Sequence, residues 1–343
     1  MDKYAERLVS DILSFKSPDG VDYLPADTVY FGGGTPTLLE PYHFKKILCA
    51  IRERFGISDN AEISAECNPK TADFDKLCAL RGLGINRLSI GMQSSDNDEL
   101  KALGRIHTFE DCKNTFAAAR RVGFENISLD LMYGIPGQTR DSFKKSLADV
   151  MSLEPNHISS YALKIEEGTP FYKLKDELIL PCEDDVCAMY EDMCKALMDN
   201  GYNKYEISNF AKSGFESKHN LRYWTYEDYV GFGVAAHSFV GGERIENSRD
   251  FEGYIRGENI EISRDKISPD EQKNEYVMLR MRLSDGVDIK EFEGRFGSDF
   301  DLEFGCGFKK FSPEFVEITE RFCRFTEKGF FVSNYILSEV LNF

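Results

Sequence analysis

The sequence predicts an α/β fold in which parallel strands alternate with helices, arranged as an open sheet or a barrel. Short runs rich in β-branched and aromatic residues alternate with helical patterns over residues 28–163. Four of these runs end in a concentration of small or polar residues, which is typical of the ligand-binding edge of a parallel sheet. Right-handed crossovers between parallel strands then fix most of the topology.

The first predicted element is a helix over residues 2–16, because Tyr4, Leu8, Ile12 and Phe15 recur at helical spacing. Five strands are predicted at residues 28–31, 61–66, 86–91, 126–131 and 157–163. Helices are expected between them at residues 42–55, 74–80 and 141–153, with two helical stretches that end at Val122. The alternation of strands with helices implies a parallel sheet.

Beyond Pro170 this alternation ends. A helix is predicted over residues 183–198, followed by a mixed β region through Ala236. Residues 269–343 have the pattern of helices with a hairpin around residues 326–329, which resembles a winged-helix module. We therefore expect a partial barrel over residues 1–170, a β-extension over residues 171–265 and a small C-terminal helical or winged domain over residues 266–343.

Composition and charge exclude several classes of protein. The chain has 343 residues and a net charge of −17 with a pI near 4.9, which opposes binding to nucleic acid. No stretch reaches the ~18 apolar residues of a membrane span, and the charged first residues do not form a signal peptide. The nine cysteines lie at irregular spacings, unlike a secreted disulfide framework. We expect a cytosolic protein with reduced thiols and a small or partly apolar ligand.

A glycine-rich loop, Gly32-Gly33-Gly34-Thr35-Pro36, follows the first predicted strand. Glycines without a Cβ let the backbone approach a ligand, and exposed N–H groups then face any anion. Thr35 adds a hydroxyl group, and Pro36 stiffens the end of the loop. The alternative is an ordinary turn, because most glycine-rich turns bind nothing.

Glu66, Gln93 and Asp130 stand at or next to the ends of three further strands. They could offer acceptors to ribose hydroxyls, an amine or an adenine edge, and the alternative for each is a helix N-cap or a loop hydrogen bond. Arg105 could pair with a carboxylate in bidentate fashion, and its alternative is a surface ion pair. Convergence on one rim of the sheet favours a ligand site.

Five segments together resemble the radical S-adenosylmethionine (SAM) family of oxygen-independent coproporphyrinogen III oxidases. They are YFGGGTPTLL at 30–39, ECNP at 66–69, NRLSIGMQS at 86–94, LGRIH at 103–107 and DLMYGIPGQT at 130–139. The resemblance runs from Tyr4 to the C-terminus. It implies a partial (β/α)6 TIM-type radical SAM barrel and a SAM pocket that includes Gly33, Gly34, Thr35, Glu66, Gln93, Arg105 and Asp130.

Within this family, the HemW haem-chaperone branch carries a His-Asn-x-x-Tyr-Trp signature, which this chain has as His219-Asn220-Leu221-Arg222-Tyr223-Trp224. The resemblance therefore implies that His219 is a haem iron ligand. Tyr223 and Trp224 can present flat, amphipathic faces to a porphyrin. The alternative is a buried His and Trp in an ordinary loop.

Other candidate ligands carry less support. His237 matches a family segment, but its small apolar neighbours indicate a structural role. Cys187 and Cys194 are seven apart on one predicted helix, so we expect both to pack in the core. Cys182 and Cys187 have no matching second pair that would make a metal site.

By resemblance, the family holds a 4Fe–4S cluster on a Cys-x3-Cys-x2-Cys run at its first barrel strand, and no such spacing occurs among the nine cysteines. We interpret this as a missing first strand, because a chain that had evolved without it should have protected the exposed sheet edge. Without three thiolates the chain is not expected to cleave SAM reductively, and only weak SAM binding is predicted. No residue is assigned a catalytic role.

Three functions are open. The first is a haem-binding chaperone that delivers haem or a related porphyrin to a haem-requiring client protein, with any membrane contact made peripherally through that client. The second is oxidative decarboxylation of coproporphyrinogen III by a cluster-bearing form. The third is a scaffold that binds neither SAM nor haem.

Overall fold

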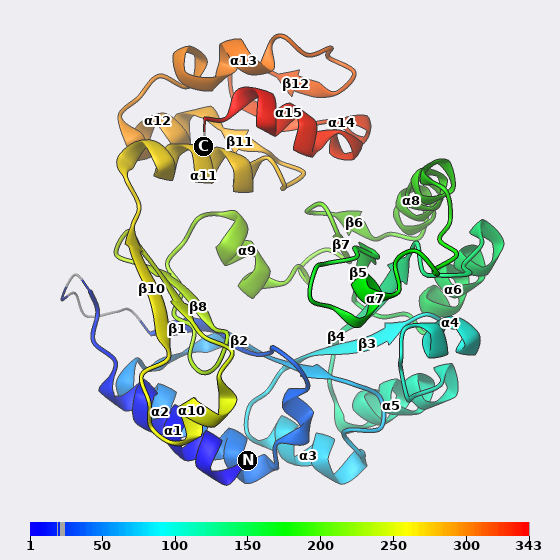
Figure 1. Ribbon diagram of the computed structural model, residues 1–343, viewed down its shortest axis with the longest axis vertical. Helices are drawn as coiled ribbons and strands as arrows, with labels where there is room; N and C mark the ends of the chain where they lie inside the picture. Colours follow the sequence, from blue (N-terminus) through cyan, green and yellow to red (C-terminus); the bar gives the residue numbers. More distant parts are fainter. Residues whose placement is uncertain (19, 21–24, 343) are drawn as a thin grey trace.

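A curved seven-stranded sheet forms the centre of the molecule, a computed structural model that describes residues 1–18, 20 and 25–342 (Figure 1). Its order is β1-β2-β3-β4-β5-β7-β6. Strands β1 to β5 are parallel, which confirms the predicted five-stranded parallel sheet, and β7 and β6 extend it in antiparallel pairing. The strands are β1 (Ala26–Phe31), β2 (Ile57–Cys67), β3 (Arg87–Gln93), β4 (Asn126–Tyr133), β5 (His157–Ala162), β6 (Asn203–Lys204) and β7 (Asn209–Ala211).

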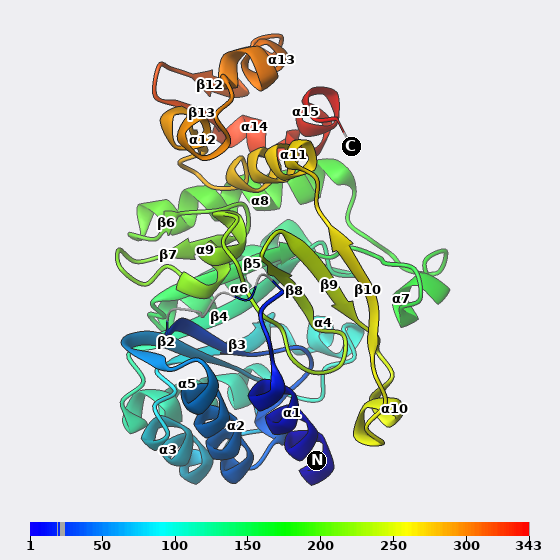
Figure 2. The same ribbon diagram turned by 90° about the vertical axis from the view of Figure 1, so that its left-hand side faces the viewer.

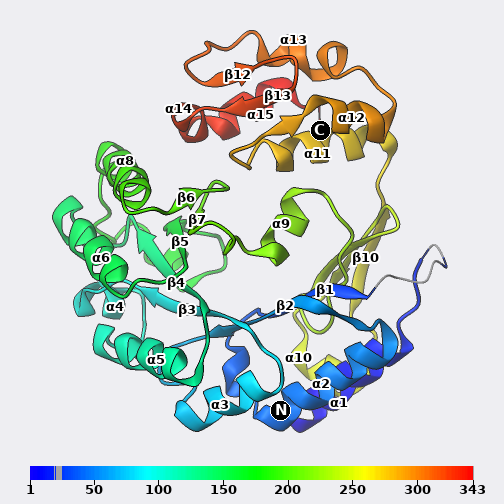
Figure 3. The ribbon, with the colours of Figure 1, turned by 180° about the vertical axis from the view of Figure 1, so that it is seen from behind.

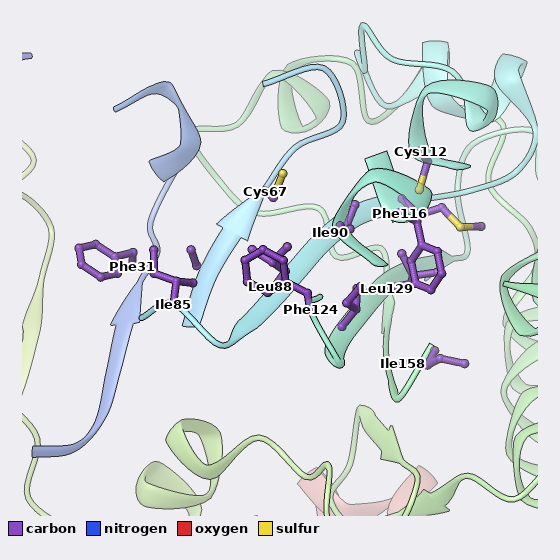
Figure 4. Packing of buried hydrophobic residues seen from close by; sticks show 14 of the residues in the cluster. Phe31, Cys67, Ile85, Leu88, Ile90, Cys112, Phe116, Phe124, Leu129 and Ile158 are labelled. Atoms are coloured by element: carbon purple, nitrogen blue, oxygen red, sulfur yellow. The ribbon is translucent and has the colours of Figure 1, made fainter. Parts of the chain in front are cut away.

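Helices cover the convex outer face of this sheet (Figure 3). They are α1 (Asp2–Ser14), α2 (Pro41–Arg54), α3 (Phe74–Gly82), α4 (Asn97–Ala102), α5 (Phe109–Val122), α6 (Arg140–Ser152) and α8 (Glu183–Asp199), with the short η1 (Pro36–Leu38) and α7 (Pro170–Lys173) in the connections. Strand residues such as Ile90 and Leu129 pack against helix residues such as Phe116 of α5 (Figure 4). This apolar layer is the main core.

The concave inner face of the sheet is polar. Successive strand residues point to opposite faces, so the residues that alternate with the apolar core positions point inward. They include Thr28, Glu62, Ser64, Arg87, Ser89, Ser128, Asp130, His157 and Ser159. The sheet therefore has one face that forms a core and one face that presents donors, acceptors and charges.

A second, three-stranded antiparallel sheet follows the barrel strands and has the order β10-β9-β8. Its elements are α9 (Lys218–Trp224), β8 (His237–Val240), β9 (Glu243–Asn247), α10 (Phe251–Ile255) and β10 (Glu261–Lys266). Helix α10 packs on α1, where the Tyr254 hydroxyl donates to Asp11 at 2.7 Å. Helix α9 lies on the concave side of the large sheet, opposite α2 and α3 (Figure 3).

The C-terminal elements lie at one end of the molecule around a second core, which includes Tyr276, Phe292 and Phe308 and also takes in Tyr226 and Phe239 (Figure 2). They are α11 (Pro269–Arg280), β11 (Val287–Asp288), α12 (Ile289–Phe296), η2 (Asp301–Gly305), α13 (Cys306–Phe308), β12 (Val316–Ile318), β13 (Phe322–Phe325), α14 (Glu327–Phe331) and α15 (Ser333–Val340). Their small sheet has the order β11-β13-β12, with helices around it.

The hairpin of this region was predicted at the wrong place. Strands β12 and β13 pair across residues 319–321, whereas residues 326–329 begin helix α14. Thr326 is the N-cap of that helix, because its hydroxyl accepts from the backbone N–H of Gly329 at 3.1 Å. The glycine that suggested a turn is thus a helical residue.

Among the described residues no helix is long and apolar enough to cross a membrane.

Candidate functional site

The glycine-rich loop after β1 is open. Gly33 and Gly34 have φ values of +80° and +117°, and a Cβ built at either would meet no atom within 4 Å. Gly32 is tight instead, since a Cβ there would lie 2.5 Å from the Tyr30 ring. The loop therefore exposes its backbone at the two positions that only glycine adopts readily.

Hydrogen bonds join this loop to the ends of neighbouring strands. Asn68, just after β2, donates to the Thr35 hydroxyl at 2.7 Å, and Arg105 donates to the amide oxygen of Asn68 at 3.2 Å. Tyr30 donates to Glu66 at 3.1 Å, and burial raises the pKa of that carboxyl. Thr35 and Arg105 thus meet at Asn68, whereas Glu66 is bonded to Tyr30, and Arg105 forms no ion pair with any described residue.

Gln93, the last residue of β3, lies beside the residues that surround the glycine loop. Its backbone has φ +67°, a left-handed conformation that costs a non-glycine residue about 1 to 3 kcal/mol. A Cβ at the neighbouring Gly91 would lie 3.1 Å from both the Gln93 and Asn68 amide groups. A Cβ at this position would therefore force these amide groups to shift by a few tenths of an ångström.

Asp130 lies deeper than the rim, inside the barrel. The Ser89 hydroxyl donates to it at 3.0 Å, and burial is the main cause that raises its pKa to about 6. The charge of Glu66 acts in the same direction. Asp130 therefore faces the same interior as Glu66, although among the described residues it makes no hydrogen bond with the glycine loop.

Helix α9 carries His219 and is bound to the first two strands by polar contacts. The Glu62 carboxylate accepts from the backbone N–H groups of Lys218 and His219, at 3.3 and 3.1 Å. A carboxylate at a helix N-terminus satisfies donors that lack an intrahelical partner. Arg222 forms an ion pair with Asp27 of β1. These contacts fix α9 across the edge of the sheet.

The imidazole of His219 is held on three sides. Nδ1 lies 2.9 Å from the Thr28 hydroxyl, Nε2 lies 2.9 Å from the Tyr223 hydroxyl, and the ring stacks on Tyr30 at 4.9 Å and 17°. Burial is the main cause that lowers its pKa to about 4, and the Arg87 charge adds to it. The ring is therefore neutral at physiological pH, the form that binds a metal.

The two aromatic residues of the His-Asn-x-x-Tyr-Trp motif, Tyr223 and Trp224, lie on different faces of α9. Tyr223 is one turn beyond His219, so both side chains lie on one face of α9, whereas Trp224 is five positions from His219 and falls on an adjoining face. The structure thus brings Tyr223 to His219 and does not bring Trp224 there. The segment is a half-buried helix, not the ordinary loop that was the alternative.

Three side chains around His219 were not singled out from the sequence: Thr28, Tyr30 and Glu62. Thr28 and Glu62 lie 191 and 157 positions from His219. In the sequence, these residues alternate with apolar residues in β1 and β2, which indicates a polar face of the sheet. The alternation does not show which segment packs on that face.

The remaining candidates are not assembled into a site. His237 begins β8 with an exposed side chain, which corrects its expected packed surroundings. Cys194 is buried as expected, but Cys187 is exposed, because only part of α8 faces the core. Among the described residues no three His, Cys, Asp or Glu side chains gather in a way that could hold a metal ion.

The curved parallel sheet, its polar inner face and the glycine loop at its rim define a radical SAM-type barrel. Residues 20–150 match the Radical SAM superfamily and residues 267–332 match the HemN C-terminal domain. The fold is that of the Escherichia coli coproporphyrinogen III oxidase HemN, described as a radical SAM enzyme. The TM-score is 0.84 at 23% identity, over 99% of this chain and 83% of that chain.

The relatives make the assignment more specific. "Heme chaperone HemW" of Bacillus subtilis is 37% identical over 349 residues, which covers 99% of this chain and 92% of the relative. Its namesake in Lactococcus lactis is 33% identical over 99% of this chain and 90% of the relative, and that of Escherichia coli is 34% identical over 85% and 77%. The chain belongs to the HemN/HemW family of radical SAM proteins, in the HemW branch.

Proposed function

We propose that this protein is a haem chaperone that binds haem iron through His219 and passes haem to a client protein in the cytoplasm. The observation that carries the proposal is the neutral, oriented imidazole of His219, with its Nε2 facing only a hydroxyl group among the described residues. The proposal agrees with the names of the Bacillus and Lactococcus relatives, both called haem chaperones.

His219 and its neighbours fit haem. A tyrosine displaced from Nε2 would leave that nitrogen lone pair free, and neutral imidazole is a common axial ligand of haem iron. Tyr223 supplies an amphipathic ring beside the histidine, and Trp224 is a second aromatic residue at the last position of α9. Haem would supply the iron centre, while the chain supplies its orientation and a partly dry environment.

The rim residues fit SAM. The open backbone of Gly33 and Gly34 with the Thr35 hydroxyl would hold the methionine end, and Glu66, Gln93 and Arg105 offer acceptors and a cation around it. Asp130 would reach SAM only from the barrel interior. We infer a weak SAM site, separate from His219 but joined to it through Tyr30, which bonds Glu66 and stacks on His219.

The residues of this chain do not fit a 4Fe–4S cluster. The sequence has no Cys-x3-Cys-x2-Cys spacing, and the described residues hold no three-ligand group. We therefore derive no step through a cluster. The likeness to HemN, at 23% identity, shows the fold alone and does not support oxidation of coproporphyrinogen III by this chain.

The test is a haem titration followed by the Soret absorption band, with the parent protein, His219→Ala and His237→Ala. His237 is a matched control because it is an exposed histidine on β8. We expect His219→Ala to weaken binding and shift the Soret band, and His237→Ala to behave as the parent. Equal binding and identical spectra in all three proteins would refute the role of His219.

A further inference from the structure

Arg87, the first residue of β3, is a buried cation without a partner. The residue is 2% exposed, and its guanidinium makes no hydrogen bond or ion pair with any described residue. Its Nε atom is buried and unsatisfied, and so is the hydroxyl of Ser64, the residue opposite Arg87 on β2. Two orphaned donors therefore lie side by side on the polar inner face of the sheet.

A buried charge is normally paired, because desolvation without compensation is strongly unfavourable. Asp130 is the acidic group of the inner face whose pKa the Arg87 charge lowers, but it accepts a hydrogen bond from Ser89 and forms no ion pair with Arg87. The other titratable groups that feel the Arg87 charge are Tyr30, Tyr205, His157 and His219. Burial keeps these tyrosines and histidines neutral, so none of them balances the cation.

The position of Arg87 relates it to His219. Tyr30, Ser64 and Arg87 form one row across β1, β2 and β3, since Tyr30 is opposite Ser64 and Ser64 is opposite Arg87. Neighbouring strands are ~4.8 Å apart, so the Tyr30 and Arg87 backbones are about 10 Å apart. The His219 ring stacks on Tyr30 at one end of this row. A metal-ligating imidazole and an unpaired guanidinium thus face one interior.

Guanidinium binds carboxylates in a bidentate, charge-assisted geometry. Haem carries both an iron for an imidazole and carboxylates on its two propionate chains. We propose that Arg87, with the Ser64 hydroxyl beside it, anchors a propionate carboxylate of the haem that His219 ligates. This inference rests on the proposed function and names the second contact of the same ligand.

The carboxylate of SAM is the other source of the same chemistry, and the geometry disfavours it. Arg87 is at the amino end of β3, whereas Gln93 and the glycine loop lie at carboxyl ends of strands. Six extended residues separate Arg87 from Gln93, which is about 20 Å of chain. Arg105, joined to the loop through Asn68, is better placed for a SAM carboxylate.

Access to Arg87 requires α9 to move. This helix has no buried residue, and apart from the His219 ring it is attached to β1 and β2 by polar contacts with Asp27 and Glu62. Such contacts exchange with water at little cost compared with a buried apolar face. A ligand that takes His219 and Arg87 can therefore replace them.

The test compares haem with haem dimethyl ester, in which both propionates are neutral, titrated into the full chain in one detergent-containing buffer. The parent should bind haem about tenfold or more tightly than the ester, as expected for one charge-assisted contact. Arg87→Gln should lower this preference towards one, Arg87→Lys should keep part of it, and His219→Ala should weaken both ligands alike.

Equal affinity of the parent for haem and the ester would overturn the inference without any variant, so a variant that fails to fold cannot hide it. A parent that binds neither ligand would refute the proposed function instead. SAM binding, measured by calorimetry, should be the same in the parent and in Arg87→Gln. Loss of SAM binding in Arg87→Gln with an unchanged preference for haem over its ester would assign Arg87 to SAM and overturn the inference.

Discussion

The Thr28 hydroxyl lies 2.9 Å from Nδ1 of His219 and joins the edge strand β1 to helix α9. Tyr223 makes the matching contact with Nε2 at 2.9 Å. A phenol is a stronger donor and a weaker acceptor than an alkyl alcohol, so we assign the Tyr223 O–H as donor to Nε2 and the Nδ1–H as donor to Thr28. This tautomer presents Nε2 as the nitrogen for iron.

Thr28→Val is expected to weaken haem binding about tenfold, because a hydrogen bond to the second ring nitrogen orients a ligating histidine. Thr28→Ser keeps the hydroxyl and should bind as the parent. The measurement is a Soret titration together with the iron–histidine stretching band in resonance Raman spectra. If Thr28→Val changes the protein stability but leaves that band and the affinity in place, Thr28 has only a structural role.

Tyr223→Phe should change the haem affinity in the opposite direction, towards tighter binding. The Tyr223 hydroxyl competes with iron for Nε2, and one hydrogen bond contributes about 0.5 to 1.5 kcal/mol, so its loss should tighten haem binding about threefold to tenfold. Tyr229→Phe is the control, since the Tyr229 ring packs on Tyr223 at 4.6 Å and its hydroxyl makes no hydrogen bond with His219 in the described part of the chain. Weaker binding in Tyr223→Phe would mean that the hydroxyl assists haem instead of competing with it.

Stability should depend on pH through Glu206, which lies on the chain between β6 and β7. Burial raises the pKa of this carboxyl from 4.5 to about 7, although it accepts hydrogen bonds from Ser208 and Asn209. The folded state therefore holds a proton that the unfolded state releases above pH 4.5. Stability from this group is full below pH 4.5 and is lost as pH rises to about 7, with a slope of at most about 1.4 kcal/mol per pH unit.

Glu206→Gln should flatten that slope, measured as the free energy of unfolding in urea at several pH values between 5 and 8. Glu252→Gln, at an exposed position in α10, is the control and should keep the slope of the parent. Asp130, whose pKa is raised to about 6, causes a similar loss of stability over a lower pH range. This contribution remains in both variants. If the parent and Glu206→Gln show the same dependence of unfolding free energy on pH, Glu206 is not a buried, protonated carboxyl group.

The sequence was sufficient for the parallel sheet and insufficient for its inner face. Buried strands such as β3 were found because apolar residues flank every polar one, and Gly33, Thr35 and Glu66 were expected at one rim because strand ends meet there. Arg87 lies in the segment NRLSIGMQS at 86–94, but the sequence predicted no role for it. A strand pattern does not show whether a charged side chain has a partner in the folded protein. The contacts of His219 with Thr28 and Glu62 join segments more than 150 positions apart. No local pattern predicts such contacts.

Lys204 should hold the C-terminal elements against the barrel. The Lys204 side chain is 2% exposed, and its ammonium group donates to the Tyr190 hydroxyl of α8 at 2.6 Å and to Glu327 of α14 at 3.2 Å. It also lies 3.8 Å from the centre of the Phe330 ring. Lys204→Met keeps the apolar stem and removes these contacts. We expect a loss of about 1 to 3 kcal/mol, concentrated in α14, because a buried charge-assisted bond and a cation–π contact are removed together.

Hydrogen exchange of backbone amides measures this loss element by element. In Lys204→Met the amides of α14 should exchange faster while those of β3 and β4 stay protected. Lys212→Met is the matched control, since Lys212 lies 5.3 Å from the Tyr202 ring and contacts the barrel side only. If α14 is equally protected in both variants, then the apolar contacts around Phe330, and not the Lys204 charge, attach the C-terminal elements to the barrel.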